Sequence, residues 1–200
     1  MSHTPDLPPG FRHELTLRLG RERVFTDPAD LAVYAQDDTP RAIIPGAVVF
    51  PRDTDELAAA LRAAYRHGVP VVPRGAGSGN VGGALPVPGA LVVAFECMKA
   101  LGELDPVNRT LRVQPGVTNQ QVQQAAAANG LFWPPDPGSS PYCQVGGNLA
   151  MNAAGPGAVK RGVTRDWVLG LEAVTGTGDV IHVGTETSKG VVGYDLTRLL

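Results

Sequence analysis

The sequence predicts an α+β protein of two lobes, a small lobe with parallel strands and a larger lobe with mixed and antiparallel structure. Three observations support this fold class. A strand, a helix and two more strands follow one another between residues 47 and 95, and the pattern changes after residue 100. Later, the turn sequence Gly176-Thr177-Gly178-Asp179 separates two further strands. The predicted divisions are a helical segment over 1–40, a first lobe over 41–98 and a second lobe over 99–200.

The N-terminal segment contains two predicted helices, at residues 11–19 and from Pro28 to about Tyr34. In the first lobe, a strand over 47–51 precedes a helix that begins after Asp53 and ends at Gly68. Strands over 69–72 and 90–95 follow. Because a strand–helix–strand unit almost always forms a right-handed crossover, we expect these strands to be parallel.

The second lobe is predicted to begin with a strand over 110–114, which alternates like a half-buried strand. Thr118 to Gln121 form a capping box for a helix that ends at Asn129, before Gly130. Residues 134–148 are rich in proline and glycine and are predicted to be irregular, with one helical turn over 146–152. Strands over 167–174 and 180–183 then flank the turn at 176–179.

Composition excludes several function classes. The net charge is −2, and no run of Lys or Arg exceeds two residues, so we expect no nucleic-acid partner. No signal-peptide pattern and no transmembrane segment are visible. The two cysteines form no disulfide framework, and no cluster of metal ligands stands out. These features predict a cytoplasmic protein, with peripheral membrane attachment as the alternative.

A glycine-rich loop follows the strand that ends near Val72. Such a loop brings backbone N–H groups close to a ligand, and successive N–H groups that point one way bind anions. Arg74 adds a permanent charge beside them. The sequence therefore predicts a phosphate or pyrophosphate cradle made by Pro73, Arg74, Gly75, Ala76, Gly77, Ser78, Gly79 and Asn80.

Two alternatives remain open for this loop. Residues 77–82 match G-x-G-x-x-G, the fingerprint of a nicotinamide-binding Rossmann dehydrogenase. That fingerprint requires a helix inside the motif, whereas Pro86 and Pro88 disfavour one here. The other alternative is a cluster of structural turns without a ligand.

A second glycine-rich region extends from residue 135 to residue 156. With the motifs at 73–79, 105–110, 114–117, 146–153, 162–166 and 193–197, it gives the chain a specific resemblance. The sequence resembles the FAD-binding domain of the vanillyl-alcohol-oxidase flavoproteins, the family with the p-cresol methylhydroxylase-type fold. Within that family it is most similar to the glycolate oxidase FAD subunit and D-lactate dehydrogenase branch.

The resemblance implies an FAD-dependent oxidoreductase in which FAD lies between two lobes and receives a hydride from a 2-hydroxy acid of the glycolate or D-lactate type. Residues 74–79 would hold the pyrophosphate through their main-chain N–H groups. The flavin and its ribityl chain would be lined by Asp136, Pro137, Gly138, Ser139, Val145, Gly146, Gly147, Asn148 and Asn152, and enclosed by Gly155, Gly162, Val163 and Thr164. No histidine lies in the first loop, so we expect non-covalent FAD.

Two departures from the family limit the prediction. Glu96 and Cys97 stand where relatives carry a small polar segment, so contacts from that loop are not transferred. The sequence ends shortly after Tyr194, which predicts an incomplete domain whose substrate site lies in a missing C-terminal domain. We therefore assign no catalytic residue. The alternative function is an FAD-binding or interaction module without turnover of its own. The expected partners are the substrate and an electron acceptor or other oxidase subunits.

Overall fold

The computed structural model describes residues 7–187, 189–191 and 193–200. The chain divides into two compact units, the first comprising Met1–Met98 with Val174–Val180 and the second Lys99–Ala173 with Ile181–Leu200. One sheet is largely parallel and another is a two-stranded hairpin, which confirms the predicted α+β class. No helix in the described part of the chain is long and apolar enough to cross a membrane.

A four-stranded sheet forms the centre of the first unit. Its strands in spatial order are β1 (Val24–Phe25), β2 (Ala47–Val49), β4 (Leu91–Ala94) and β3 (Val71–Arg74). β2 and β3 each pair in parallel with β4, so Val48 and Val72 flank Val92. The predicted parallel arrangement is therefore confirmed, with β4 between the other two. The antiparallel strand β1 was not predicted, because two residues are too few to show an alternating pattern.

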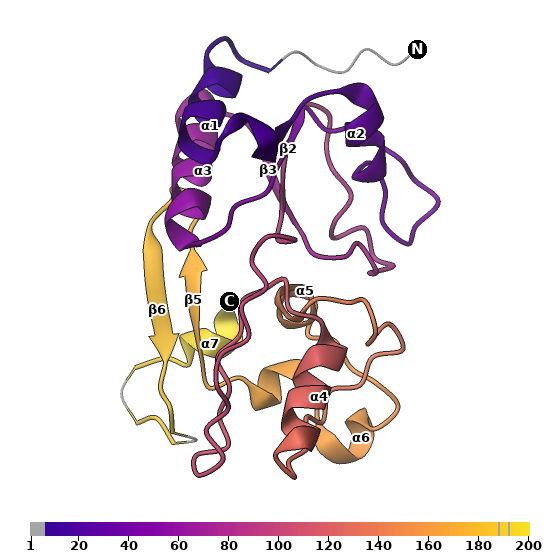
Figure 1. The fold of residues 1–200 in the computed structure, drawn as a ribbon, viewed down its shortest axis with the longest axis vertical. Coiled ribbons are helices and arrows are strands. Elements are labelled where there is room, and N and C mark those ends of the chain that lie inside the picture. Colours follow the sequence, from indigo (N-terminus) through magenta and orange to yellow (C-terminus); the bar gives the residue numbers. More distant parts are fainter. Residues whose placement is uncertain (1–6, 188, 192) are drawn as a thin grey trace. The chain divides into compact units, whose positions relative to one another are not determined.

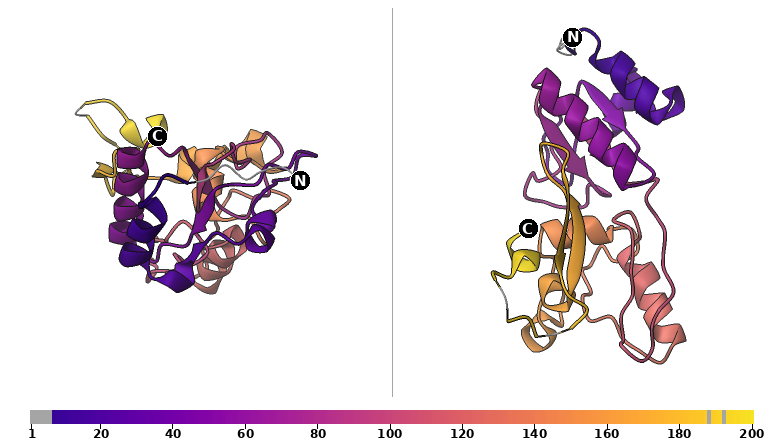
Figure 2. Two further views of the ribbon diagram at one scale, coloured as in Figure 1. Left: turned by 90° about the horizontal axis from the view of Figure 1, so that it is seen from above. Right: turned by 90° about the vertical axis from the view of Figure 1, so that its left-hand side faces the viewer.

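Helices cover both faces of this sheet. α1 (Phe11–Leu19) and α3 (Thr54–His67) lie side by side over one face, and α2 (Pro28–Val33) lies over the other (Figure 1 and Figure 2). The 3₁₀ helix η1 (Arg21–Arg23) connects α1 to β1. Leu91 and Val93 of β4 pack with the α1 and α3 residues, whereas Val92 and Ala94 pack with Leu31 of α2. The core of this unit is thus formed on both sides of β4.

The ends of α3 confirm the predicted signals. The Asp53 carboxylate accepts a hydrogen bond from the Glu56 N–H at 2.8 Å. Gly68 caps the other end with φ 65°, a left-handed conformation that glycine adopts without steric cost. β3 begins at Val71 rather than at residue 69, since the Val69 N–H still bonds to the Ala64 carbonyl of α3.

The second unit is built mainly from short helices and ordered loops. Its elements are α4 (Asn119–Ala128), α5 (Val145–Ala150), α6 (Ala158–Arg161), η2 (Thr164–Trp167), α7 (Leu196–Leu199) and most of β5 (Gly170–Val174) and β6 (Val180–Gly184). Val174 and Val180, next to the hairpin turn, belong to the first unit. The predicted capping box at Thr118 and Gln121 is present. The predicted helical turn is α5, and β5 and β6 confirm the predicted hairpin, although β5 begins only after η2.

The strand expected over 110–114 is not formed. In these residues the structure has only isolated bridges, Leu101 to Val113 and Asp105 to Thr110. The Asp105 carboxylate accepts hydrogen bonds from the N–H groups of Val107 and Asn108, at 2.8 and 2.9 Å, which makes a tight turn. Pro115 lacks the N–H that a longer ladder needs. Backbone hydrogen bonds also join Gly102 to Arg112 and Gln114 to Ala100, but the two segments form no continuous ladder.

Replacing Asp53 with alanine is expected to lower the free energy of unfolding by about 1 kcal/mol, because the Glu56 N–H loses its cap. Asp53→Asn keeps an oxygen acceptor and is the matched control, with an expected loss well below that of alanine. Urea unfolding followed by far-ultraviolet circular dichroism measures both variants. Equal losses would show that the charge of Asp53, and not its cap geometry, stabilises α3.

Candidate cofactor site

The first predicted loop leaves the carboxyl end of β3. Most of its residues are exposed or partly exposed, and Gly77 has φ 69°. The Asp38 N–H donates to the Gly79 carbonyl at 3.2 Å, which ties the loop to the segment after α2. The loop is thus a surface segment held by a neighbouring segment of the same unit.

Arg74 is the exception, since only 8% of it is exposed. The guanidinium packs against Gly77 and over the Tyr34 ring, with its Cζ atom 5.6 Å from the ring centroid. Its expected place beside a bound anion stays a prediction. Burial lowers the pKa of Arg74, while Tyr34, Asp37 and Glu96 oppose that effect. Arg74 therefore supports the loop from within the unit.

Sequence reasoning missed the residues around Arg74, which come from 34–39 and from the end of β4. The Tyr34 hydroxyl donates to Glu96 Oε1 at 3.0 Å. Asp37 is 9% exposed, and its Oδ1 accepts hydrogen bonds from the Thr39 N–H and hydroxyl at 3.1 and 2.6 Å. Burial opposes ionisation of Asp37, but the hydrogen bonds from Thr39 lower its pKa overall. In the sequence, residues 37–40 (Asp-Asp-Thr-Pro) indicate only where the helix from Pro28 ends.

In the second unit, a buried asparagine at the start of α4 organises the loops predicted to line the flavin. Asn119 is 0% exposed, and its Nδ2 donates to the Pro135 carbonyl at 3.0 Å and to Ser140 Oγ at 2.8 Å. Its Oδ1 accepts from Trp133 Nε1 at 2.9 Å and from Asn148 Nδ2 at 3.3 Å. One side chain therefore joins the segment 133–140 to α5, and the sequence analysis did not single it out.

Gln123, one turn further along α4, extends these contacts. Its Nε2 donates to Asp136 Oδ1 at 3.1 Å, and its Oε1 accepts from Ser140 Oγ at 3.0 Å. Asp136 itself is exposed, whereas Asn148 is 5% exposed. Asp136 and Asn148 are thus held by the same network around α4.

The later predicted residues form a second set of loops, over 152–166. Asn152 Oδ1 accepts from the Arg165 N–H at 3.1 Å, and the buried Thr164 hydroxyl donates to the Ala153 carbonyl at 2.7 Å. Asp166 Oδ2 accepts from the Val163 N–H at 2.9 Å. Asn152, Val163 and Thr164 are therefore brought together in the same unit as Asp136.

The predicted glycines fall into two groups. A Cβ on Gly77, Gly146, Gly155 or Gly162 would collide with protein atoms; at Gly155 it would lie 1.9 Å from the Asp136 carbonyl oxygen. A Cβ on Gly79, Gly138 or Gly147 would meet no atom within 4 Å. Packing requires Gly146 and Gly155, because the atoms they would strike belong to a proline and to the backbone. Gly77 and Gly162 would meet side-chain atoms, but their φ of 69° and 79° favours glycine. Protein packing does not explain Gly79, Gly138 or Gly147.

Two buried side-chain oxygens in the described part of the chain have no hydrogen-bond partner, Asp37 Oδ2 and Gln144 Oε1. Buried polar atoms are nearly always paired, so such exceptions require an explanation. Gln144 directly precedes Val145 and the open glycine Gly147, and Asp37 is next to the residue that bonds to Gly79. Gln144 is therefore adjacent in sequence to a predicted cofactor loop. Asp37 is adjacent to a residue that is hydrogen-bonded to the other predicted loop.

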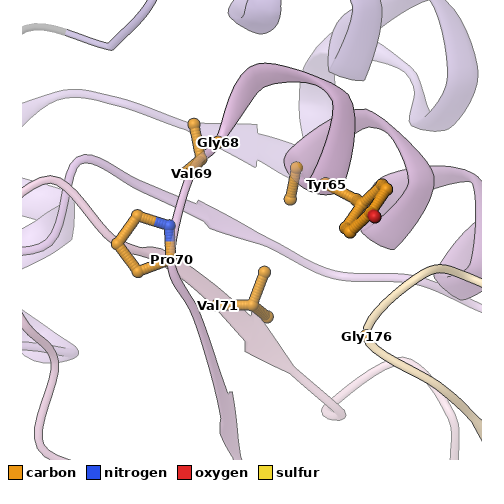
Figure 3. A pocket seen from close by; sticks show the side chains of 7 residues that line it. Tyr65, Gly68, Val69, Pro70, Val71 and Gly176 are labelled. Atoms are coloured by element: carbon orange, nitrogen blue, oxygen red, sulfur yellow. The ribbon is translucent and has the colours of Figure 1, made fainter.

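The pocket drawn in Figure 3 lies elsewhere. It is an open hollow of ≈ 530 Å³ between the end of α3 and the start of β3, lined by Ala64, Tyr65, Gly68, Val69, Pro70, Val71 and Gly176. The glycine loop follows the opposite, carboxyl end of β3. This pocket therefore contains none of the predicted cofactor residues.

The two cysteines are free, Cys97 exposed and Cys143 buried. Cys143 therefore lies in the packed interior, and Cys97 lies at the surface.

Comparison with known proteins assigns the family. A family model described as an FAD binding domain matches residues 45–184, which include both glycine-rich regions. The chain belongs to this FAD-binding family. The match confirms the predicted resemblance and supports FAD as the cofactor.

Curated relatives of this FAD-binding chain include glycolate oxidase subunit GlcD of Bacillus subtilis, 44% identical over 181 residues. That alignment covers 90% of this chain and 38% of the relative. D-2-hydroxyglutarate dehydrogenase of Stutzerimonas stutzeri is 37% identical, and the alignment covers 96% of this chain and 41% of the relative. D-lactate dehydrogenase of Archaeoglobus fulgidus is 41% identical, and the alignment covers 84% of this chain and 38% of the relative. The chain therefore spans about two fifths of the length of these relatives.

Solved structures support the fold of the FAD-binding chain. An alkyldihydroxyacetonephosphate synthase superposes with a TM-score of 0.82 at 21% identity, over 92% of this chain and 36% of that protein. p-Cresol methylhydroxylase with bound substrate gives a TM-score of 0.73 at 22% identity, over 95% and 37%. At these identities the comparison shows the fold alone, and it confirms the predicted p-cresol methylhydroxylase type.

Replacing Asn119 with aspartate is expected to destabilise the second unit, because a buried carboxylate would face the Pro135 carbonyl without the amide donors. The expected loss is roughly 1–3 kcal/mol or more, the cost of an unsatisfied buried group that is charged. Gln120→Glu, the same chemical change at an exposed neighbouring position, is the control and is expected to have little effect. Denaturant unfolding monitored by tryptophan fluorescence compares the two. A loss no larger for Asn119→Asp than for Gln120→Glu would refute the role given to Asn119.

Proposed function

We propose that this chain is the FAD-binding part of an oxidoreductase that oxidises a 2-hydroxy acid of the glycolate or D-lactate type by hydride transfer to FAD. The observation that carries the proposal is the family match over both glycine-rich regions, together with the names of the relatives. Glycolate, D-lactate and D-2-hydroxyglutarate are all carboxylic acids with a hydroxyl group on the adjacent carbon. The shared chemistry of these relatives supports the reaction class.

We assign the pyrophosphate of FAD to residues 73–80 and the flavin side to the predicted residues between Asp136 and Thr164. Among these side chains only Arg74 and Asp136 carry a charge. A largely uncharged lining suits an isoalloxazine ring, and backbone N–H groups suit a diphosphate. The open positions at Gly79, Gly138 and Gly147 and the unpaired Gln144 Oε1 support this assignment.

The contribution of this chain is binding and orientation. When bound, FAD supplies the redox chemistry by accepting a hydride from the carbon that carries the substrate hydroxyl. The second-unit network around Asn119 holds the segment that contains Asp136 and fixes α5, which carries Gly147 and Asn148. No residue of this chain is assigned as a general acid or base. Non-covalent attachment of FAD stays a prediction from the lack of a histidine in the first loop.

The partners and the location stay predictions from the sequence. An electron acceptor or other oxidase subunits would reoxidise the flavin, and the location would be cytoplasmic, with peripheral membrane attachment as the alternative. The module without turnover remains the second candidate function, because the chain spans only 38% of the GlcD relative.

The purified protein reconstituted with FAD is expected to be yellow, and acid precipitation should release the flavin into the supernatant if attachment is non-covalent. In a longer version that includes the expected C-terminal domain, anaerobic addition of glycolate, D-lactate or D-2-hydroxyglutarate should then bleach the flavin absorption band. An L-lactate addition is the stereochemical control for D-lactate. A protein that binds FAD but is bleached by none of these acids would favour the module, and a protein that cannot bind FAD would contradict both candidates.

Gly79→Ala and Gly147→Ala are expected to weaken FAD binding about tenfold or more, since each new methyl group would occupy space assigned to the cofactor; tenfold corresponds to about 1.4 kcal/mol. The apoprotein should be as stable as the wild type or more stable by about 0.4–1 kcal/mol, because alanine restricts the unfolded chain. Isothermal calorimetry and thermal unfolding measure the two effects separately.

Gly176→Ala is the matched control for these two variants. Its Cβ would also meet no atom within 4 Å, but it lies in the hairpin turn, outside the assigned residues. It is expected to bind FAD as the wild type does. If Gly79→Ala and Gly147→Ala also bind FAD with unchanged affinity, these glycines do not face the cofactor and the residue assignment is wrong.

A further inference from the structure

The side chain of Arg74 contacts the glycine loop at two separate points. Its Nη2 atom is so close to Gly77 that a Cβ on that glycine would lie 2.3 Å away. Its Nη1 donates to the carbonyl of Ala84 at 3.5 Å. Arg74, the last residue of β3, therefore contacts the loop over 75–83 near its start and just after its end.

The Tyr34 ring stacks against the guanidinium of Arg74. The Arg74 Cζ atom lies 5.6 Å from the centroid of the Tyr34 ring, within the range of a cation–π interaction. The ring is itself fixed, because its hydroxyl donates to Glu96 and its edge packs on Phe50 with the ring centroids 5.6 Å apart. Burial, followed by the hydrogen bond to Glu96, raises the pKa of Tyr34, so the hydroxyl remains a donor at neutral pH.

Asp37 and Glu96 act electrostatically on Arg74, and Asp37 is nearly as buried as Arg74 itself, at 9% and 8% exposed. Their negative charges reduce the attraction of the guanidinium for a further anion. Its planar shape, in contrast, is used fully, with a face on Tyr34 and nitrogens toward Gly77 and Ala84.

We propose that Tyr34 and Arg74 are positioning residues, whose stacked side chains hold the loop over 75–83 in the conformation that receives the diphosphate of FAD. Arg74 acts through the shape of the loop and not as an ion-pair partner of the phosphates. The inference rests on the proposed function, since it concerns the same loop. It adds the segment after α2 to the determinants of cofactor affinity.

Three variants separate shape from charge. Arg74→Lys keeps the positive charge and loses the planar fork. Tyr34→Leu removes the ring, and Tyr34→Phe keeps the ring but loses the hydrogen bond to Glu96. Tyr65→Leu, the same change at a tyrosine that is 65% exposed on α3, is the control. The ligands are FAD and ADP, because ADP carries a diphosphate without a flavin.

Calorimetry is expected to show that Arg74→Lys and Tyr34→Leu each lower the affinity for FAD and for ADP by about tenfold. This is the scale of a partly buried cation–π contact. Tyr34→Phe and Tyr65→Leu should bind both ligands within about threefold of the wild type, a difference below the ~1.4 kcal/mol of a tenfold change. Hydrogen exchange of the apoprotein should become faster in residues 75–83 for the first two variants, with β4 unchanged. Local exchange distinguishes positioning from a general loss of stability, which would also accelerate β4.

Several outcomes would overturn the proposal. If Arg74→Lys retains wild-type affinity, charge on the diphosphate is what matters, and if Tyr34→Leu retains it, the stack is not needed. If hydrogen exchange becomes faster in β4 as well as in the loop, Tyr34 and Arg74 have only a general structural role. That result would also overturn the proposal. A wild-type protein that binds neither FAD nor ADP would overturn the proposed function itself. The variants test only the positioning role, so the two failures are distinguishable.

Discussion

The parallel pairing of β4 with a strand on each side is the constraint on which the first unit depends. β4 is buried on both faces, with Leu91 and Val93 toward α1 and α3 and with Val92 and Ala94 toward α2. Because β3 runs parallel to β4, the carboxyl ends of both strands lie at one edge of the sheet. Arg74 therefore ends one strand close to the place where Glu96 follows the other. The glycine loop, its supporting arginine and the carboxylate that holds Tyr34 all result from that single direction of pairing.

The second unit is stabilised differently. Its buried apolar cluster is small, consisting of Val117, Val122 and Val145 with partly buried neighbours. The polar network around Asn119 fixes its loops instead, and the buried asparagine has all four of its hydrogen bonds within the unit. A satisfied buried network specifies one arrangement of the groups that it joins, whereas apolar contacts tolerate small shifts. Loops that must present backbone groups to a cofactor benefit from such directional contacts.

The sequence was sufficient where local chemistry determines the structure. Asp53, Gly68 and Thr118 mark helix ends through their own caps, and the apolar runs mark β2 and β4. The sequence was insufficient where a contact joins distant residues. Tyr34 and Glu96 are 62 positions apart, and Asn119 bonds to residues as far as 29 positions away, so no periodicity or turn signal relates them. The strand expected at 110–114 is a different case, because its neighbour over 100–105 is close in sequence and the two form only isolated bridges.

Arg74 illustrates why a residue type alone does not give a role. Beside a glycine-rich loop, an arginine is typical of a phosphate ligand, and its position in the sequence is consistent with that interpretation. In the fold, its guanidinium stacks on Tyr34, and Asp37 and Glu96 reduce the attraction of its charge for a further anion. The attraction of the loop for an anion then depends on its backbone N–H dipoles, which are strong only where several converge on one point. Convergence is a property of loop shape, and the buried side chain of Arg74 contacts that loop at Gly77 and at Ala84.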